Sequence, residues 1–182
     1  MKQSGFYTIF LDLLRDLFDA ENQIVEALPK MVQASSHREL KEALAQHLDE
    51  TKHQVQRLKT IFKMLNENPT GKRSQAMQAL LAEGAEIINQ QLNPSVKDAA
   101  LIVAAQKVEH YEIAGYGGAR AFAESLKDAK NNADYDEIID LLQETLDEEG
   151  AADSKLTSIA TGGFFTTGIN EEAEQESLGR DS

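Results

Sequence analysis

Residues 95–127 read SVKDAALIVAAQKVEHYEIAGYGGARAFAESLK. Small and apolar side chains recur along this stretch every three or four residues, which is the period of an α-helix. Glu112 stands at the centre of the apolar stripe, and Glu109 lies one helical turn before it. The stripe consists of Leu101, Ala105, Val108, Gly115, Ala119, Phe122 and Leu126. The stretch therefore predicts a long helix that carries two acids on its packing face.

The flanking sequence predicts three more long helices, over about residues 6–34, 36–65 and 134–160. A shorter helix is predicted over about residues 75–92, between the second and third long helices. Short turns favour antiparallel neighbours, and a longer connection allows one hairpin of helices to pack beside another. We therefore predict an all-α fold, a ferritin-like four-helix bundle with a short extra helix between its second and third helices.

The composition supports this fold and excludes several kinds of site. Helix-forming residues dominate, and no proline follows Pro94. The chain has no cysteine, so it can form neither a disulfide nor a metal–thiolate site. Its formal net charge of −13 repels phosphate backbones and argues against nucleic-acid binding.

The N-terminal sequence lacks the features of a secretory signal. Acidic residues appear by position 12, and no apolar segment leads to a small-residue cleavage site. No apolar stretch reaches the length of a membrane span. We therefore expect a cytoplasmic protein that binds neither membranes nor nucleic acids.

Acidic side chains interrupt the apolar stripes of the other long helices as well. Glu21 has apolar residues one turn away on either side. Glu50 and His53 form an E-x-x-H pair, and this spacing places both side chains on one helix face. A single E-x-x-H pair is a weak signal, and a single glutamate is more often exposed. The prediction therefore depends on the combination of these residues across four helices.

The fourth long helix resembles the second. Residues 146–156 repeat the leucine spacing found around the E-x-x-H pair. In this alignment Glu148 corresponds to Glu50, and Ala151 corresponds to His53. We interpret the two helix pairs as halves of a degenerate repeat whose second half has lost its histidine.

Together these residues predict a site for two metal ions inside the bundle. The six predicted ligands are Glu21, Glu50, His53, Glu109, Glu112 and Glu148. Glu144 or Glu149 could take the place of Glu148, whereas His47 is expected on the flank of its helix. Oxygen-rich sites with an imidazole suit iron or manganese, so the predicted cofactor is two iron ions or two manganese ions. Five carboxylates and two divalent ions leave a net charge of about −1.

Several of these segments resemble one known family. They are the run AAQKVEHYEIA at residues 104–114, the pair Ala20-Glu21, the E-x-x-H pair and the run ETLDEE at residues 144–149. Together they resemble the YciE/YciF family of ferritin-like bacterial stress proteins over about residues 7–160. The resemblance implies a ferritin-like bundle, a homodimer, a di-iron or di-manganese site on the same six residues, and a role in stress. Ala151 departs from the wider ferritin-like pattern, which has a second histidine.

The sequence changes character after residue 160. Residues 161–168 are rich in glycine and threonine and contain Phe164 and Phe165, and residues 171–182 are acidic. We therefore divide the chain into a bundle over residues 1–160 and a tail over residues 161–182. Two interpretations of the tail stay open, a loosely ordered segment or a segment whose phenylalanines dock on the bundle or on a second subunit.

Two functions are compatible with these features. The first is a dinuclear metal protein that oxidises ferrous iron with dioxygen or peroxide, or that disposes of peroxide. The second is a non-catalytic dimeric bundle that acts through protein association in stress. The expected partners are metal ions, dioxygen or peroxide, and a second copy of the chain.

Overall fold

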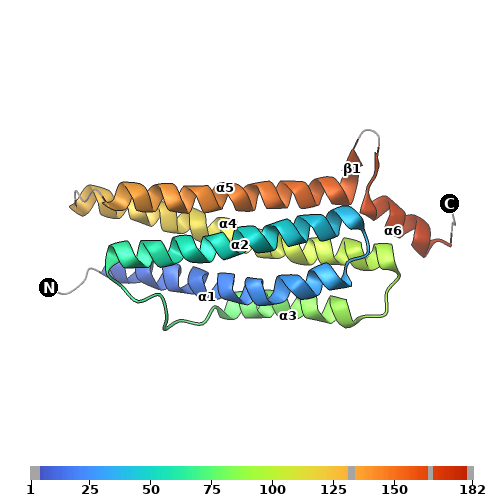
Figure 1. Ribbon diagram of the computed structural model, residues 1–182, viewed down its shortest axis with the longest axis horizontal. Helices are drawn as coiled ribbons and strands as arrows, with labels where there is room; N and C mark the ends of the chain where they lie inside the picture. The colour runs from blue at the N-terminus through green and yellow to red at the C-terminus, as the bar shows by residue number, and fades with distance from the viewer. Residues whose placement is uncertain (1–4, 131–133, 164–165, 180–182) are drawn as a thin grey trace.

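The computed structural model describes residues 5–130, 134–163 and 166–179. Within these ranges the chain forms six helices and one hairpin of two short strands (Figure 1). The elements are α1 (Gly5–Ala34), α2 (Arg38–Leu65), α3 (Gln75–Asn89), α4 (Pro94–Lys130), α5 (Asp134–Thr161), β1 (Gly162–Gly163), β2 (Thr166–Thr167) and α6 (Ile169–Ser177). The prediction of an all-α fold is confirmed apart from this hairpin. The helix predicted to end near residue 127 continues to Lys130.

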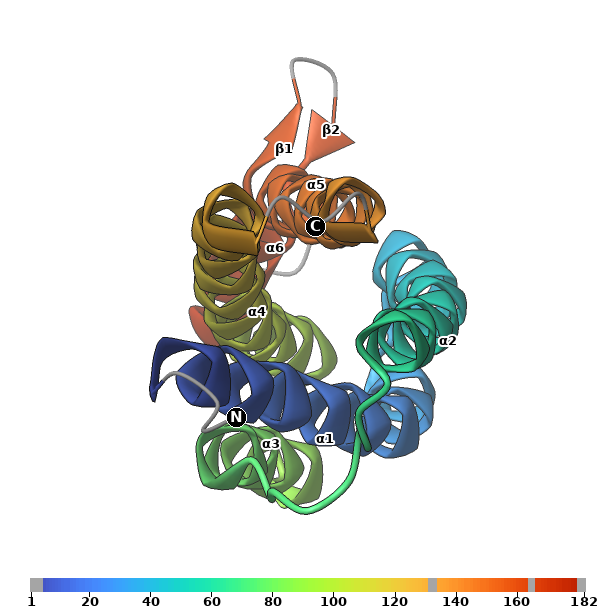
Figure 2. The same cartoon turned by 90° about the vertical axis from the view of Figure 1, so that its left-hand side faces the viewer.

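The four long helices lie side by side around a common core. Helix α1 packs against α2 and α4, and α5 packs against α2 and α4, so the four close a ring when seen from the end (Figure 2). Helix α3 lies outside this ring against α1 and α4. Together with the loop before it, α3 carries the chain back along the bundle, so that α4 begins at the end where α1 finishes (Figure 1).

Two apolar clusters fill the ring on either side of a polar layer. The first is built around Ile24, Leu44, Leu101, Leu156 and Ile159. The second is built around Phe10, Leu14, Phe62, Tyr116 and Ile138. Burial of each large apolar side chain contributes about 1.5–3 kcal/mol. The two clusters therefore hold the four helices together above and below the polar residues, whose burial is unfavourable by itself.

Helices α1 and α4 approach closely at Gly115. A Cβ atom at this position would lie 2.7 Å from Cδ2 of Leu17, a side chain that is fully buried. Glycine weakens a helix relative to alanine, so its presence inside α4 is explained by this contact with α1.

A residue of α4 caps the start of α2. Asp98 is buried, and its carboxylate accepts hydrogen bonds from the backbone N–H groups of Ser36 at 2.9 Å and His37 at 2.7 Å. Both residues precede Arg38, the first residue of α2, so no carbonyl of that helix accepts from their N–H groups. These hydrogen bonds therefore hold the turn between α1 and α2 against α4.

The segment after α5 folds back onto the bundle. The strands β1 and β2 pair antiparallel, and α6 then packs against α4 and α5. Ile169 and Ala173 of α6 are buried, and Glu176 accepts a hydrogen bond of 3.0 Å from the backbone N–H of Ser95. Phe164 and Phe165 lie outside the described residues. None of the helices in the described ranges combines the length and the apolar character needed to cross a membrane.

Candidate metal centre

The polar layer between the two apolar clusters contains acids from three helices and one histidine. Glu21 belongs to α1, His47 to α2, Glu109 and Glu112 to α4, and Glu149 to α5. All five residues are at least 95% buried. Because the helices are continuous and packed on both sides of the layer, these side chains point into the interior of the bundle.

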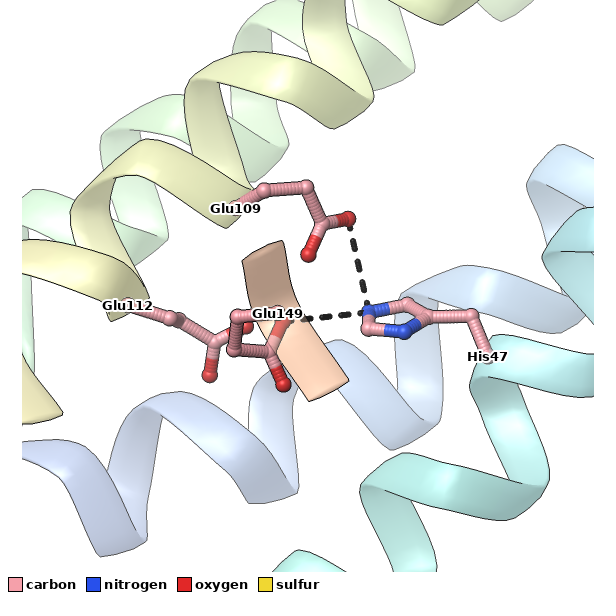
Figure 3. A group of neighbouring side chains, drawn as sticks. All are labelled: His47, Glu109, Glu112 and Glu149. Carbon is pink, nitrogen blue, oxygen red and sulfur yellow. Dashed lines mark ion pairs between the residues drawn. The ribbon is translucent and has the colours of Figure 1, made fainter. Parts of the chain in front are cut away.

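Four of these residues meet at one point, as Figure 3 shows. His47, Glu109, Glu112 and Glu149 each offer one ligand atom, and these atoms all lie within 4.8 Å of one another. Nε2 of His47 lies 3.4 Å from Oε1 of Glu109 and 3.9 Å from Oε2 of Glu149. One imidazole from α2 therefore faces carboxylates from α4 and α5.

Glu21 completes the layer from the side of α1. The hydroxyl of Tyr116 donates a hydrogen bond to Oε1 of Glu21, and both side chains are buried. Burial and the nearby carboxylates raise the pKa of the Tyr116 hydroxyl well above its usual range. Tyr116 therefore remains a proton donor and holds the orientation of the Glu21 carboxylate.

Many polar atoms of the layer have no hydrogen-bond partner within the described part of the chain. They are Oε2 of Glu21, Nδ1 and Nε2 of His47, Oε2 of Glu109, both carboxylate oxygens of Glu112 and Oε2 of Glu149. Native interiors contain few such atoms, because each one left without a partner costs about 1–3 kcal/mol. Oxygen and imidazole nitrogen atoms that converge without partners are a donor set that fits iron or manganese.

The electrostatics of the layer favour added positive charge. Burial, and then the neighbouring carboxylates, raise the pKa of the Glu21 and Glu112 carboxyl groups well above the usual range. The pKa of Glu109 is raised in the same direction by burial and by Glu149. Without bound cations, the layer therefore retains protons on carboxyl groups that would be ionised in water.

The structure brings three of the predicted ligands together and places the other three elsewhere. Glu21, Glu109 and Glu112 point into the layer. Glu50 lies at its edge, with 29% of its side chain exposed and Oε2 at 3.7 Å from Nδ1 of His47. His53 is exposed and does not belong to the group.

Glu148 faces Arg57 rather than the centre of the bundle. The Arg57 guanidinium donates to both oxygens of Glu148, at 2.6 and 2.7 Å, and to Glu144 at 2.6 Å. The next residue, Glu149, turns inward instead. Because successive helical residues are rotated by about 100°, the two adjacent glutamates point in different directions.

Two residues of the layer, His47 and Glu149, were therefore assigned differently by the sequence analysis. The helical spacing of buried residues on α2 runs through Leu44, His47, Thr51, Gln54 and Leu58. Leu44 and Leu58 stand out in the sequence, but the three residues between them are polar, and the E-x-x-H pair indicated a different face. At the equivalent positions of the leucine repeat, α5 carries Thr145, Glu149 and Ala152. In this alignment α5 has Thr145 where α2 has His47, and α2 has Thr51 where α5 has Glu149.

Gln54 connects Glu149 to the edge of the bundle. Its side-chain Nε2 donates to Oε2 of Glu148 at 3.0 Å and to Oε1 of Glu149. Arg57 in turn holds Glu148. This chain of contacts fixes the orientation of Glu149, in the way that outer residues commonly orient the ligands of a metal.

Comparisons with known proteins place these features in context. A family model described as "Domain of unknown function (DUF892)" matches residues 6–174. Protein YciF of Escherichia coli (strain K12) is 40% identical over 178 residues, which are 97% of this chain and 99% of that protein. The similarity continues past residue 160, into the segment that the sequence analysis sets apart as a tail.

Two solved structures have the same fold. The crystal structure of the E. coli stress protein YciF matches with a TM-score of 0.79 and 39% identity, covering 86% of this chain and 94% of that one. The structure of YcfI from Rhodopseudomonas palustris matches with a TM-score of 0.79 and 38% identity, covering 88% of this chain and 99% of that one.

Proposed function

Because the chain belongs to the family described as a domain of unknown function (DUF892), as its resemblance to the YciF proteins predicts, we propose that it is a ferritin-like metal protein with a role in stress. In this proposal the polar layer binds two iron or two manganese ions. The ring of four long helices, with α3 as the crossover between α2 and α4, supports the ferritin-like assignment. The stress role is supported by the description of E. coli YciF as a stress protein.

The observation that carries this proposal is the set of buried donor atoms without partners. Four carboxylates and one imidazole converge between two apolar clusters, and most of their polar atoms have no hydrogen bond within the described residues. An unpaired buried charge is strongly unfavourable. Four carboxylates and two divalent ions sum to zero charge, so bound metal would remove this penalty.

The residues have distinct roles in the proposed site. Glu21, Glu109, Glu112, Glu149 and His47 would hold the ions. Tyr116 and Gln54 orient Glu21 and Glu149, and the apolar clusters exclude bulk water. Bound iron or manganese would supply the electrons that reduce dioxygen or peroxide. Burial favours the protonated form of these carboxyl groups, which would give up protons on binding cations.

Metal loading of the purified protein tests the proposal. Apoprotein is mixed with Fe(II) or Mn(II) without oxygen, and the metal per chain is counted by elemental analysis after desalting. We expect two ions per chain, and consumption of peroxide or dioxygen when the iron-loaded protein is exposed to either. Absence of both metals after loading would exclude this function.

Some positions that face the layer carry residues that bind metal weakly or not at all, and this favours a second function. Thr51, Gln54 and Ala152 occupy positions on α2 and α5 that face the layer or its edge, and none is a strong metal ligand. The description of YcfI provisionally assigns that relative a structural role. The alternative is a bundle that acts through protein association. A His47→Ala plus Glu109→Gln variant that folds and keeps its stress phenotype would favour this alternative.

We also propose that the protein forms a homodimer in the cytoplasm. Phe6 and Ile9 of α1 are 41% and 57% exposed, which is high for large apolar side chains. Phe6 contacts the ring of half-buried Phe122, so this apolar surface lies where α1 meets α4. Sedimentation analysis tests the association, and an Ile9→Lys variant should sediment as a monomer.

A further inference from the structure

A cavity opens beside the polar layer between α2 and α5. Its volume is about 140 Å³, enough for several water molecules. His47 and Glu109 form part of its lining, so the cavity touches the candidate ligands. Two further cavities lie against α3, and neither is lined by a residue of the polar layer. The opening between α2 and α5 therefore adjoins the donor atoms most directly.

Small side chains produce this opening. Ala43 of α2 and Ala151 and Ala152 of α5 line the cavity. Leu44 and Leu156 line it as well and belong to one of the apolar clusters. Larger residues at the alanine positions would fill the space between the two helices. Ala151 is itself exposed, so it marks the side of the cavity nearest to solvent.

The Arg57–Glu148 ion pair stands next to the cavity. Glu148 lines the cavity while both of its oxygens accept hydrogen bonds from Arg57. The pair joins α2 to α5 at this point and keeps the positive charge of Arg57 bound to a carboxylate. A cation in the cavity therefore meets a neutralised ion pair rather than a free guanidinium.

Polar atoms lead from the surface to the layer. Glu50 lines the cavity with part of its side chain exposed, and its Oε2 is 3.7 Å from Nδ1 of His47. Nε2 of the same imidazole is 3.4 Å from Glu109. Lys155 also lines the cavity; its Nζ donates to the side chain of Gln46 at 3.0 Å, and its positive charge acts on Glu50. Oxygen and nitrogen donors thus follow one another from solvent to the centre of the bundle.

We propose that this cavity is the entrance through which hydrated divalent cations reach the polar layer, with Glu50 as the first carboxylate they meet. The proposal rests on the proposed metal-binding function. It assigns a role to Glu50 that differs from permanent ligation, because a partly exposed carboxylate beside His47 can exchange water for protein oxygen early in the transfer. The alanines of α5 provide the width, and the layer provides the final ligands.

Stopped-flow loading of the apoprotein with Mn(II), followed with a free-metal indicator dye, tests the entrance. An Ala151→Phe variant should load at least tenfold more slowly than the unmodified protein, while the final number of ions per chain stays the same. A Ser154→Phe variant is the matched control, because Ser154 is exposed on α5 and does not line the cavity. This control should load at the original rate.

A second variant keeps the test decisive if the phenylalanine disturbs folding, which circular dichroism would reveal. Glu50→Gln should slow loading by about tenfold, the low end of electrostatic steering, and reduce its dependence on salt. Glu50→Asp should restore most of the rate. If unmodified protein binds no metal at equilibrium, the proposed function fails. If it binds metal but Ala151→Phe and Glu50→Gln load at the original rate, only the entrance is wrong.

Discussion

Nε2 of His47 lies 3.4 Å from Oε1 of Glu109, so an imidazole on α2 faces a carboxylate on α4 inside the bundle. The contact crosses the interior of the ring and brings together two residues from different helix pairs. His53, only six residues later in the same helix, is exposed. The rotation of α2 about its own axis thus decides which histidine can bind metal.

The two histidines give a direct test of the site. Removing the buried imidazole in His47→Ala takes away one donor from the cluster, and we expect the affinity for Mn(II) or Fe(II) to fall at least tenfold. His53→Ala is the matched control and should bind with unchanged affinity. Isothermal titration calorimetry measures both. Weakened binding in His53→Ala alone would show that α2 presents its other face.

Gln54 is expected to act on metal binding through Glu149. Its amide donates to Glu149 and Glu148, so Gln54→Ala frees the Glu149 carboxylate and leaves it without its buried donor. Outer residues that orient ligands typically change metal affinity by about 10–100-fold. The apoprotein should also lose about 1–3 kcal/mol of unfolding free energy. Gln56→Ala, at an exposed position of the same helix, should change neither quantity in calorimetry or urea unfolding.

The stability of the apoprotein should depend on pH through the buried acids. The pKa of Glu112 is raised in the folded state by burial and by Glu21 and Glu149. Above the usual carboxyl pKa of about 4.5, the unfolded chain therefore releases protons that the folded chain keeps. Since the unfolded state then binds fewer protons, the free energy of unfolding falls as pH rises from that value, by up to about 1.4 kcal/mol per pH unit for each such group.

Urea unfolding of the apoprotein between pH 5 and 8 measures this slope. A Glu112→Gln variant has no proton to release at this position, so its slope should be smaller than that of the unmodified protein. Saturation with Mn(II) should remove most of the fall, because bound cations stabilise the ionised carboxylates. An identical slope in the variant would mean that Glu112 is already ionised in the folded apoprotein.

Replacing glycine by alanine at two positions of α4 should change the free energy of unfolding in opposite directions. In Gly115→Ala the new Cβ would lie 2.7 Å from Cδ2 of buried Leu17, so the packed core must shift, and we expect a loss of about 1–3 kcal/mol. In Gly117→Ala no atom lies within 4 Å of the new Cβ, and the better helix propensity should add up to about 1 kcal/mol. Thermal and urea unfolding of both variants check the sign of each change.

Much of the fold follows from local sequence patterns. The apolar spacing predicted the long helices within a few residues, because a helix needs only local hydrogen bonds and one continuous packing face. Glu21 and Glu112 were predicted to face inward because each stands within an apolar stripe, and Glu109 because it lies one turn before Glu112. On α1 and α4, therefore, the local pattern was sufficient to place the acids.

The same reasoning was insufficient on α2 and α5. On each of these helices charged residues occupy two neighbouring faces within the polar layer, so the apolar stripe no longer indicates which face is inward. Arg57 draws Glu148 to the edge, and this leaves the adjacent Glu149 to face the core. The contact between Arg57 and Glu148 joins residues 91 positions apart, so no local pattern contains it.

Local sequence patterns did not predict other long-range contacts either. Asp98 caps a turn that lies 61 residues away at His37, and Glu176 of α6 binds the start of α4. The acidic composition of residues 171–182 gave no indication that part of this segment packs on the bundle. The sequence by itself determined the helices, their order and three of the inward acids, because each of these depends on residues within a few turns. The tertiary structure alone decided which faces of α2 and α5 point inward, because helix rotation is set by partners that meet only when the bundle is formed.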